Sequence, residues 1–243
     1  MNILVTGANG LLGRYLVELL SNYHKVFAIV KDKEKLNFEL NDNISAIEID
    51  LSLIDTKLFP KNIDVVYYLA QSNRFREFPE GVDDMLSINV VAPNILAKWA
   101  VKSGVKKFIY ASSGGVYTNP NKPVKEFFYI FANEKLGFYL NSKLSAEMLL
   151  KNYASLFETF AIIRPFFMYG VGQNETMLIP RLIQSVQNEK EITLNGENGI
   201  KINPIYVTDA SQAVANILDL SGEYIITSYW NDFQTGNTIK INP

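Results

Sequence analysis

The chain has 243 residues, of which 48% are hydrophobic and 20% are charged, and its formal net charge at pH 7 is -2. We expect one sizeable domain, or a main domain with a small satellite, because a chain of this composition can bury a large core. The small negative charge argues against nucleic acid as a partner, since such binding depends on neutralising a phosphate backbone. With no cysteine and one histidine, the chain predicts no metal site.

The first residues are those of a strand and carry no export signal, since apolar residues begin at Ile3 without a basic segment before them. No apolar run approaches the roughly 20 residues that a membrane-spanning helix needs. The absence of cysteine fits a reducing compartment. We therefore expect a cytoplasmic protein with no membrane partner.

Short β-branched or apolar runs alternate with amphipathic segments of helix length from residue 2 to about residue 165. This alternation predicts an α/β fold with a doubly wound parallel sheet, the Rossmann architecture. The predicted strands are Ile3–Thr6, Val26–Val30, Ser45–Ile49, Asp64–Leu69, Lys107–Ala111 and Phe160–Arg164. The predicted helices run from Leu11 to about Ser21, from Asp84 to Ser103, and across Tyr139 to about Leu156.

The pattern changes after Arg164-Pro165, where glycines separate shorter elements. We expect a dinucleotide-binding domain over residues 1–165 and a small substrate-facing region over 166–243. Within that region, residues 201–220 are expected to return to the main domain, because Val207–Leu220 has a helical pattern.

Three glycines stand between the first predicted strand and the first predicted helix, in Thr6-Gly7-Ala8-Asn9-Gly10-Leu11-Leu12-Gly13. Glycines at such a turn allow backbone N–H groups and the positive end of a helix to approach a pyrophosphate. The spacing is G-x-x-G-x-x-G, and the alternative is an ordinary glycine-rich turn. The residues expected to contact a dinucleotide here are Gly7, Asn9, Gly10, Leu11, Leu12 and Gly13.

The end of the second predicted strand bears on the choice between NAD and NADP. An acidic residue there would bind an unphosphorylated ribose. Val30 occupies the expected position and Lys31 follows it, which favours the 2′-phosphate of NADP. Asp32 keeps NAD as the alternative if the strand ends one or two residues later, and a solvated loop lysine is the plainer interpretation of Lys31.

Further motifs follow in a fixed order along the chain. They are Ile49-Asp50-Leu51, Tyr68-Leu69-Ala70-Gln71, Asn89, Tyr110-Ala111-Ser112-Ser113, Tyr139-Leu140-Asn141-Ser142-Lys143 with Ala146-Glu147, Arg164-Pro165, Tyr169-Gly170 and Asn203-Pro204-Ile205-Tyr206-Val207-Thr208-Asp209. With these motifs the chain resembles the extended short-chain dehydrogenase/reductase family, in its epimerase/dehydratase branch, over residues 1 to about 227.

This resemblance implies a nucleotide-sugar substrate, NADP or NAD as cofactor, and a homodimer joined through the helices of residues 84–103 and 139–156. In such an enzyme, Asp50 would bind the adenine amino group, and Leu51 would pack against the ring. Further residues that the resemblance places at the cofactor are Leu69, Ala70, Gln71, Asn89, Ala111, Tyr139, Lys143 and Pro165.

Tyr139 and Lys143 are four residues apart and share one face of a helix. A neighbouring ammonium favours the phenolate of a tyrosine, whose pKa is otherwise near 10, too high for a base at neutral pH. The pair can then exchange the proton of a carbinol while a nicotinamide exchanges the hydride. Ser113, at the end of the fifth strand, is expected to donate to the substrate oxygen.

The residues after Ser113 distinguish between reactions. In the 4,6-dehydratases of this branch an Asp-Glu pair stands there, whereas this chain has Gly114-Gly115. Dehydration is therefore disfavoured, and carbonyl reduction or epimerisation is expected. The residues expected to contact substrate are Ser72, Ser113, Phe167 and Arg181.

Two alternatives stay open. The aromatic cluster Phe127, Phe128, Tyr129 and Phe131 also fits the reduction of a non-sugar carbonyl, although packing beneath the Tyr139 helix is the plainer interpretation. A dinucleotide-binding sensor without turnover is the other alternative, and the Ser113, Tyr139 and Lys143 set argues against it.

Overall fold

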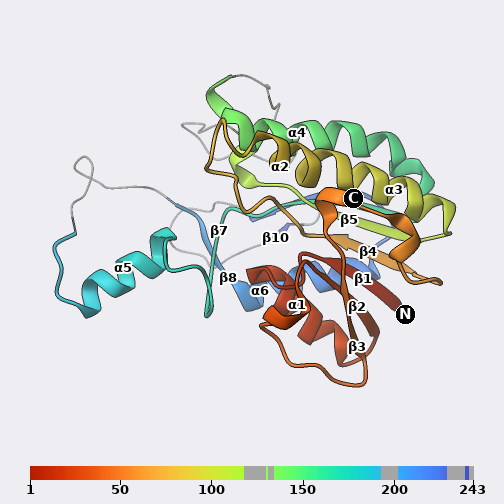
Figure 1. The fold of residues 1–243 in the computed structure, drawn as a ribbon, viewed down its shortest axis with the longest axis horizontal. Coiled ribbons are helices and arrows are strands. Elements are labelled where there is room, and N and C mark those ends of the chain that lie inside the picture. Colours follow the sequence, from red (N-terminus) through yellow and green to blue (C-terminus); the bar gives the residue numbers. More distant parts are fainter. Residues whose placement is uncertain (118–129, 131–133, 193–201, 229–238, 241–243) are drawn as a thin grey trace.

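The computed structural model describes residues 1–117, 130, 134–192, 202–228 and 239–240. Within these residues, eight strands form one large sheet with the order β10-β9-β6-β5-β4-β1-β2-β3, in which all neighbours are parallel except β9 and β10. The sheet lies between two layers of helices (Figure 1). The order 3-2-1-4-5-6 confirms the predicted doubly wound α/β fold.

The predicted strands agree with the structure to within one residue at each end. The strands of the large sheet are β1 (Asn2–Thr6), β2 (Lys25–Val30), β3 (Ile44–Glu48), β4 (Val65–Tyr68), β5 (Lys107–Ala111), β6 (Thr159–Arg164), β9 (Gly222–Ser228) and β10 (Ile239–Lys240). Hydrophobic periodicity did not predict β9. Residues 222–227 of this strand pair with the whole of β6, a contact between distant segments that local pattern does not reveal.

Each face of the sheet buries its own hydrophobic core. One core lies under α1 (Leu11–Ser21) and α6 (Val207–Ala215). The other lies under α3 (Ala92–Lys102) and α4 (Gly137–Leu150), which run along the opposite face in Figure 1. Because the central strands are covered on both faces, β4 is buried at all four positions, as expected for a parallel sheet.

The helix predicted from Asp84 to Ser103 is three consecutive pieces. α2 (Val82–Leu86) leads into a π-helical turn over Ser87–Val91 and then into α3. Two tyrosine hydroxyls from the sheet contact this turn, since Tyr68 donates to the carbonyl of Ile88 at 2.6 Å and Tyr110 to that of Asn89 at 3.3 Å. The wider turn satisfies these buried hydroxyls, and a hydrophobic pattern alone does not predict it.

A smaller unit precedes the return of the chain to the main sheet. β7 (Phe167–Tyr169) pairs with β8 (Pro204–Tyr206), and α5 (Leu178–Gln187) lies between them in the chain. Figure 1 shows α5 projecting away from the sheet, and none of its residues is buried. α6 starts directly after β8 and packs against α1.

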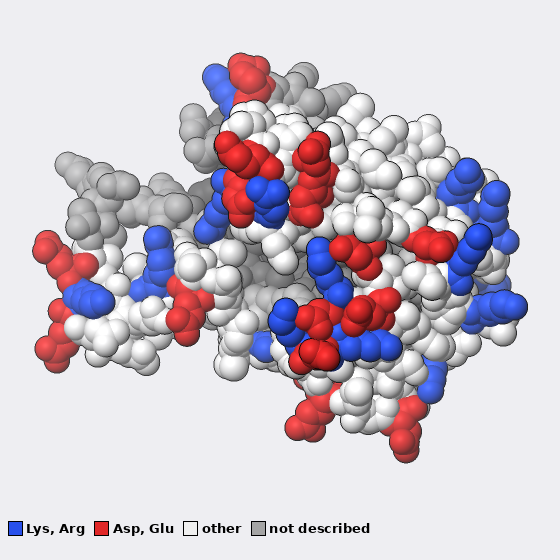
Figure 2. All heavy atoms as spheres, viewed as in Figure 1, with Lys and Arg blue, Asp and Glu red and all other residues white. Residues whose placement is uncertain are grey.

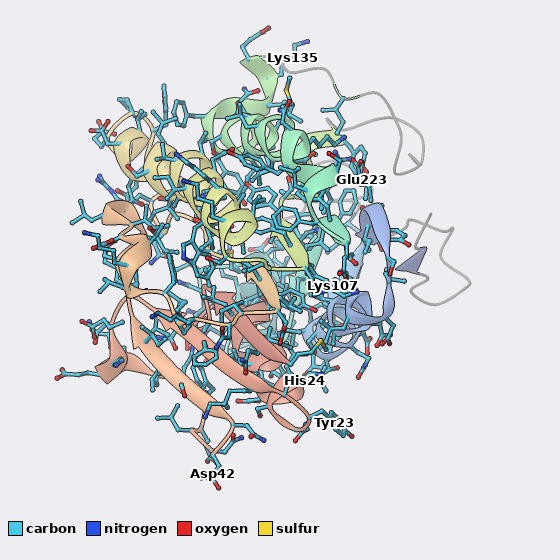
Figure 3. All side chains as sticks on the ribbon, turned by 90° about the vertical axis from the view of Figure 1, so that its right-hand side faces the viewer. Tyr23, His24, Asp42, Lys107, Lys135 and Glu223 are labelled. Carbon is cyan, nitrogen blue, oxygen red and sulfur yellow. The ribbon has the colours of Figure 1, made fainter. Side chains whose placement is uncertain are left out.

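Short 3-10 turns connect several elements. They are Lys33–Lys35, Leu51–Leu53, Thr56–Leu58, Gly114–Tyr117, Glu134–Leu136, Lys151–Leu156 and Asn216–Asp219. Figure 3 shows the end of the molecule where β2, β5 and β9 begin, with His24, Lys107 and Glu223. The one histidine of the chain therefore stands at the end opposite the carboxyl ends of the parallel strands. Among the described helices, none is long and apolar enough to cross a membrane.

Candidate active site

The glycine turn joins β1 to α1 at the carboxyl end of the sheet. Gly7 has a φ of +66°, and a Cβ there would lie 2.8 Å from the backbone of Ala70. A Cβ at Gly13 would overlap the carbonyl oxygen of Gly7. Gly10 precedes α1 and has no side-chain cap, so the first N–H groups of the helix face the turn and are available to an anion.

Asn9 adds a hydrogen-bond acceptor to this turn. Its Nδ2 donates to the backbone carbonyl of Lys35 at 3.0 Å, and the backbone carbonyl of Asn9 accepts from Asn37 Nδ2 at 2.7 Å. Asn9 Oδ1 is buried and has no hydrogen-bond partner among the residues that the structure describes. The bond to Lys35 fixes the orientation of the amide, so an acceptor is left for a donor such as a ribose hydroxyl. The turn and this orphaned acceptor fit a dinucleotide.

Lys31 and Asp50 form an ion pair beside the turn, with Lys31 Nζ 3.0 Å from Asp50 Oδ2. The Lys31 side chain is 68% exposed. Burial alone would raise the pKa of Asp50, but hydrogen bonds from Ser52 and Lys31 outweigh it and lower this pKa. Asp32 caps the next 3-10 turn and pairs with Lys35 at 2.8 Å. Asp32, which follows β2, and Asp50, which follows β3, are thus both already bound to lysines.

The segment after β4 lies between the glycine turn and the π-helical turn. The N–H of Ala70 donates to Thr6 Oγ1 at 3.3 Å, and the N–H of Ser72 donates to Asn89 Oδ1 at 3.0 Å. Asn89 is fully buried, and its Nδ2 donates to Ser142 Oγ on α4 at 3.0 Å. Asn89 therefore links the end of β4 to the helix that carries Tyr139.

Tyr139 lies in the first turn of α4, with its hydroxyl at the carboxyl ends of β4 and β5. The hydroxyl donates to Gln71 Oε1 at 2.9 Å. Burial raises the pKa of Tyr139 to about 12, and a hydrogen bond from Ser113 opposes this shift. In this arrangement the phenol is protonated at neutral pH and can act as an acid, and it needs a nearby positive charge to act as a base.

Lys143 follows one helical turn later and is 1% exposed. Its Nζ donates to the carbonyl of Ala111 at 2.9 Å and lies 5.3 Å from the ring centre of Tyr110. Burial lowers the pKa of Lys143 to about 7, and the negative charge of Glu147 opposes this shift. Glu147 therefore helps to keep a charge on the buried lysine.

Glu147 belongs to a buried ion pair that the sequence analysis did not identify. Arg164, the last residue of β6, donates from Nε to Glu147 Oε1 at 2.9 Å and from Nη2 to Oε2 at 2.5 Å. Arg164 Nη1 also donates to the hydroxyl of Tyr117 at 2.8 Å. The two paired side chains are 3% and 2% exposed. The signal in the sequence was an arginine at the end of a buried strand and a glutamate four residues after Lys143.

The residues expected to contact substrate lie in different environments. Ser72 is fully buried, and its hydroxyl contacts Asp84. Phe167 is 39% exposed at the start of β7, and Arg181 is exposed on α5. The carbonyl of Pro165 accepts from the N–H of Gly114 at 2.8 Å. The aromatic cluster of residues 127, 128, 129 and 131 lies outside the described residues.

The glycine pair after Ser113 is closely surrounded. A Cβ at Gly114 would lie 2.5 Å from the ring of Phe166, and a Cβ at Gly115 would lie 2.9 Å from Leu140. Larger side chains at these two positions would need their neighbours to move.

The molecular face drawn in Figure 2 is hollowed between the part that carries α5 and the body of the sheet, and charges of both signs surround the hollow. Among the described residues, no group of three or more histidine, aspartate or glutamate side chains is placed to hold a metal ion.

A family model described as "NAD dependent epimerase/dehydratase family" matches residues 3–226. The dTDP-D-glucose 4,6-dehydratase of Dictyostelium discoideum is 26% identical over 97% of this chain, and a Bacillus subtilis protein described as an uncharacterized UDP-glucose epimerase is 26% identical over 90%. The chain spans 59% of the length of the first relative and 72% of the second.

Solved structures are similar to this chain as well. MoeE5 in complex with UDP-glucuronic acid and NAD is 26% identical with a TM-score of 0.80, over 98% of this chain and 78% of that one. The UDP-N-acetylglucosamine 4-epimerase of Methanobrevibacter ruminantium M1 has the same identity, TM-score and coverage, and its structure contains UDP-N-acetylmuramic acid.

Proposed function

The chain belongs to the NAD dependent epimerase/dehydratase family, and we propose that it is an NAD-dependent nucleotide-sugar epimerase or ketoreductase that uses Ser113, Tyr139 and Lys143. The observation that carries the proposal is the position of the Tyr139 hydroxyl. It lies at the carboxyl ends of the parallel strands, bonded to a segment that is itself bonded to the glycine turn. Ligands of doubly wound sheets bind at this edge.

The glycine turn supports a dinucleotide as cofactor, which when bound would supply hydride transfer. The N–H groups of Leu11, Leu12 and Gly13 would hold the pyrophosphate at the start of α1. Asn9 Oδ1, buried and without a partner in the described part of the chain, would accept from a ribose hydroxyl. Further residues proposed to line this cofactor are Leu51, Leu69, Ala70, Asn89, Ala111 and Pro165.

For the choice of dinucleotide, we propose NAD and treat NADP as the competing hypothesis. Lys31, the cation that favours a 2′-phosphate, is paired with Asp50. The negative charge of Asp50 beside Lys31 would oppose a 2′-phosphate there, while the orphaned acceptor on Asn9 suits a hydroxyl donor and not a phosphate oxygen. The similar MoeE5 structures contain NAD.

In the proposed chemistry, the phenolate of Tyr139 would take the carbinol proton when the substrate is oxidised, and the phenol would return a proton to the carbonyl oxygen when the substrate is reduced. Lys143, buried one turn along the helix, would stabilise the phenolate by its charge. Ser113 would donate to the substrate oxygen and polarise the carbonyl.

Gly114 and Gly115 support epimerisation or reduction over dehydration. Neither can transfer a proton, and close contacts with Phe166 and Leu140 leave little space for an acidic pair. Dehydratases are among the relatives of this chain, so the choice of reaction is part of the proposal.

We further propose that residues 166–192, with Phe167 and Arg181, face the nucleotide sugar. The proposed assembly is a cytoplasmic homodimer through α2, α3 and α4. Apolar side chains on α2, α4 and the π-helical turn stay exposed in the single chain, namely Leu86, Val91, Met148 and Leu149 at 42%, 49%, 63% and 48%.

The test is incubation of the purified chain with a panel of UDP- and dTDP-sugars and either NAD or NADP, with the products analysed by mass spectrometry and NMR. We expect an epimer without net consumption of cofactor, or a reduced product with stoichiometric consumption. Tyr139→Phe should lower turnover by about 10²–10⁴-fold and lower NAD affinity far less, while Tyr23→Phe, at an 82% exposed residue, should change neither. Turnover retained in Tyr139→Phe would contradict the proposed role, and no product from any sugar would favour a binding protein.

A further inference from the structure

Gln71 is an exposed residue on a fixed stretch of backbone. The residue before it, Ala70, is bonded through its N–H to Thr6 Oγ1, and the residue after it, Ser72, is bonded through its N–H to Asn89 Oδ1. The first bond joins this stretch to the end of β1 and the second joins it to the π-helical turn. The backbone of Gln71 is therefore held from both sides, although its side chain is exposed.

The side chain of Gln71 contacts the oxygen that the proposed function uses as acid and base. The Tyr139 hydroxyl donates to Gln71 Oε1 at 2.9 Å. Four residues later, the Phe75 ring packs against the Tyr139 ring, with 5.3 Å between ring centres. The segment 71–75 thus contacts Tyr139 both at its hydroxyl and at its ring, which keeps the amide against the reacting oxygen.

An amide can serve a tyrosine in both protonation states. Its carbonyl oxygen accepts a hydrogen bond from a phenol, and its NH₂ group donates one to a phenolate. A carboxylate at the same position could only accept, and an ammonium could only donate. Rotation of the terminal amide exchanges its carbonyl oxygen and its NH₂ group while the backbone stays in place.

We propose that Gln71 is a further catalytic residue, and that its amide rotates as Tyr139 loses and regains its proton. This inference rests on the proposed function, since it gives Gln71 a part in the proton transfer of Tyr139. In the forward step, the carbinol O–H bond breaks and its proton joins the phenolate oxygen, while the C–H electron pair leaves as hydride to NAD. Gln71 then exchanges its N–H donor for its carbonyl acceptor.

Several ionisable groups from different elements surround Tyr139 and its immediate partners. They are Lys143 and Glu147 on α4, Tyr110 on β5, Arg164 on β6, Asp84 on α2 and Arg76 across the ring of Phe75. All of these are the same in variants of Gln71. A change in Tyr139 ionisation between such variants therefore reports on the amide itself.

The test compares wild type with two variants. Gln71→Met removes both the acceptor and the donor of the amide, and Gln71→Glu keeps an acceptor and adds a negative charge. The full chain is labelled with ¹³C at tyrosine Cζ, with Tyr139→Phe used to assign the signal. The fraction of Tyr139 that is ionised is measured at one fixed alkaline pH, with and without NAD. Gln212→Glu, an exposed residue on α6, makes the same charge change away from the site.

If the amide serves both states, its bond to the phenolate is the stronger one because it involves a charge. In Gln71→Met, the ionised fraction of Tyr139 at the chosen pH should then be roughly 3- to 10-fold smaller than in wild type. In Gln71→Glu it should be smaller still, by roughly tenfold or more. Gln71→Met should also lower kcat with little change in KM. Gln212→Glu should match wild type in both measurements.

The opposite order of Tyr139 ionisation among wild type and the Gln71 variants would overturn the inference. If Tyr139 ionises as readily in Gln71→Met as in wild type, or more readily, the amide only accepts a hydrogen bond from the phenol and does not stabilise the phenolate. The NMR measurement needs no turnover, so a failure of the sugar panel would contradict the proposed function without deciding the role of Gln71. Turnover of a sugar combined with the wrong order of ionisation would reject the role of Gln71 alone.

Discussion

Two helices of this protein, α4 and α5, differ in how they are attached to the fold. α4 has 14 residues and buries six of them, among them Lys143 and Glu147, against the sheet. α5 has 10 residues and buries none, although its sequence is strongly amphipathic. The helix that carries the proposed acid and base is therefore fixed by the core, whereas the helix proposed to face the substrate is not.

This difference suggests how the two tasks are separated. Proton transfer needs donors and acceptors held to within fractions of an ångström, and the buried network of Lys143, Glu147 and Arg164 supplies that rigidity. Recognition of a sugar can be altered on an exposed element without disturbing the network. Four predictions test this contrast, from the largest expected effect to the smallest.

The largest effect is expected at the buried ion pair. Glu147→Gln removes the carboxylate that the buried Arg164 guanidinium binds, and we expect a loss of about 3–5 kcal/mol in the free energy of unfolding. Urea unfolding measures this loss. The double variant Glu147→Leu with Arg164→Met should recover most of it, because the buried guanidinium that Glu147 neutralises is removed as well.

The matched control is the exposed pair of Lys106 and Glu158, whose side chains are 58% and 57% exposed and 2.6 Å apart. Glu158→Gln should leave the unfolding midpoint unchanged, because water solvates both charges. If Glu147→Gln were as mild as Glu158→Gln, the α4 network would not be the rigid part of the molecule.

The second prediction concerns the pH dependence of stability. Burial lowers the pKa of Lys143 from 10.5 to about 7, so between these values the unfolded chain binds more protons than the folded chain. Stability from this group is therefore reduced at low pH and rises as the pH increases from about 7. Relative to Lys143→Met, wild type should gain about 2–3 kcal/mol between pH 7 and 9.

Urea unfolding of both proteins at the two pH values measures this gain. All other titrating groups are shared, so their contributions largely cancel in the difference. Parallel pH profiles for wild type and Lys143→Met would mean that folding does not lower the pKa of Lys143.

The third prediction concerns the glycine turn. Alanine usually stabilises a helical position relative to glycine by about 0.5–1 kcal/mol, but a Cβ at Gly13 would overlap the carbonyl oxygen of Gly7. The clash should outweigh the helical preference and destabilise Gly13→Ala by about 1–3 kcal/mol. Calorimetric titration should also detect weaker NAD binding, and unchanged affinity would place the pyrophosphate elsewhere.

The smallest effect is expected on α5. Ile183 and Val186 are 51% and 67% exposed, so Ile183→Gln and Val186→Gln should change the free energy of unfolding by no more than about 0.5 kcal/mol. Ile109→Ala on β5, where the side chain is fully buried, should cost about 2–5 kcal/mol. A large loss of unfolding free energy in either α5 variant would mean that its side chain packs against a partner outside the single chain.

The comparison of Lys31→Ala with wild type sharpens the choice of cofactor. If NAD is the cofactor, the variant should bind NAD about as well as wild type, since Lys31 is paired with Asp50. Tighter NADP binding by wild type that is lost in the variant would instead restore the preference that the sequence suggested.

Local sequence was sufficient for much of the fold. The strands from β1 to β6 and the helix α1 follow from hydrophobic periodicity and from the glycines that end one element and begin the next. The order of the motifs gave the family, which the match over residues 3–226 confirms. Tyr139 and Lys143 share a helical face at a spacing of four, so their proximity also followed from the chain itself.

The remaining features depend on contacts between distant residues, which local pattern does not encode. β9 is a strand of the main sheet because β6 offers it an edge. The π-helical turn exists where hydroxyls of Tyr68 and Tyr110 meet the helix backbone. Burial beside Glu147 sets the pKa of Lys143, and the approach of the β4 segment to α4 brings Gln71 to the Tyr139 hydroxyl. Sequence therefore determined which groups are present, and tertiary packing decided their surroundings, since burial and long-range hydrogen bonds arise only when the chain folds.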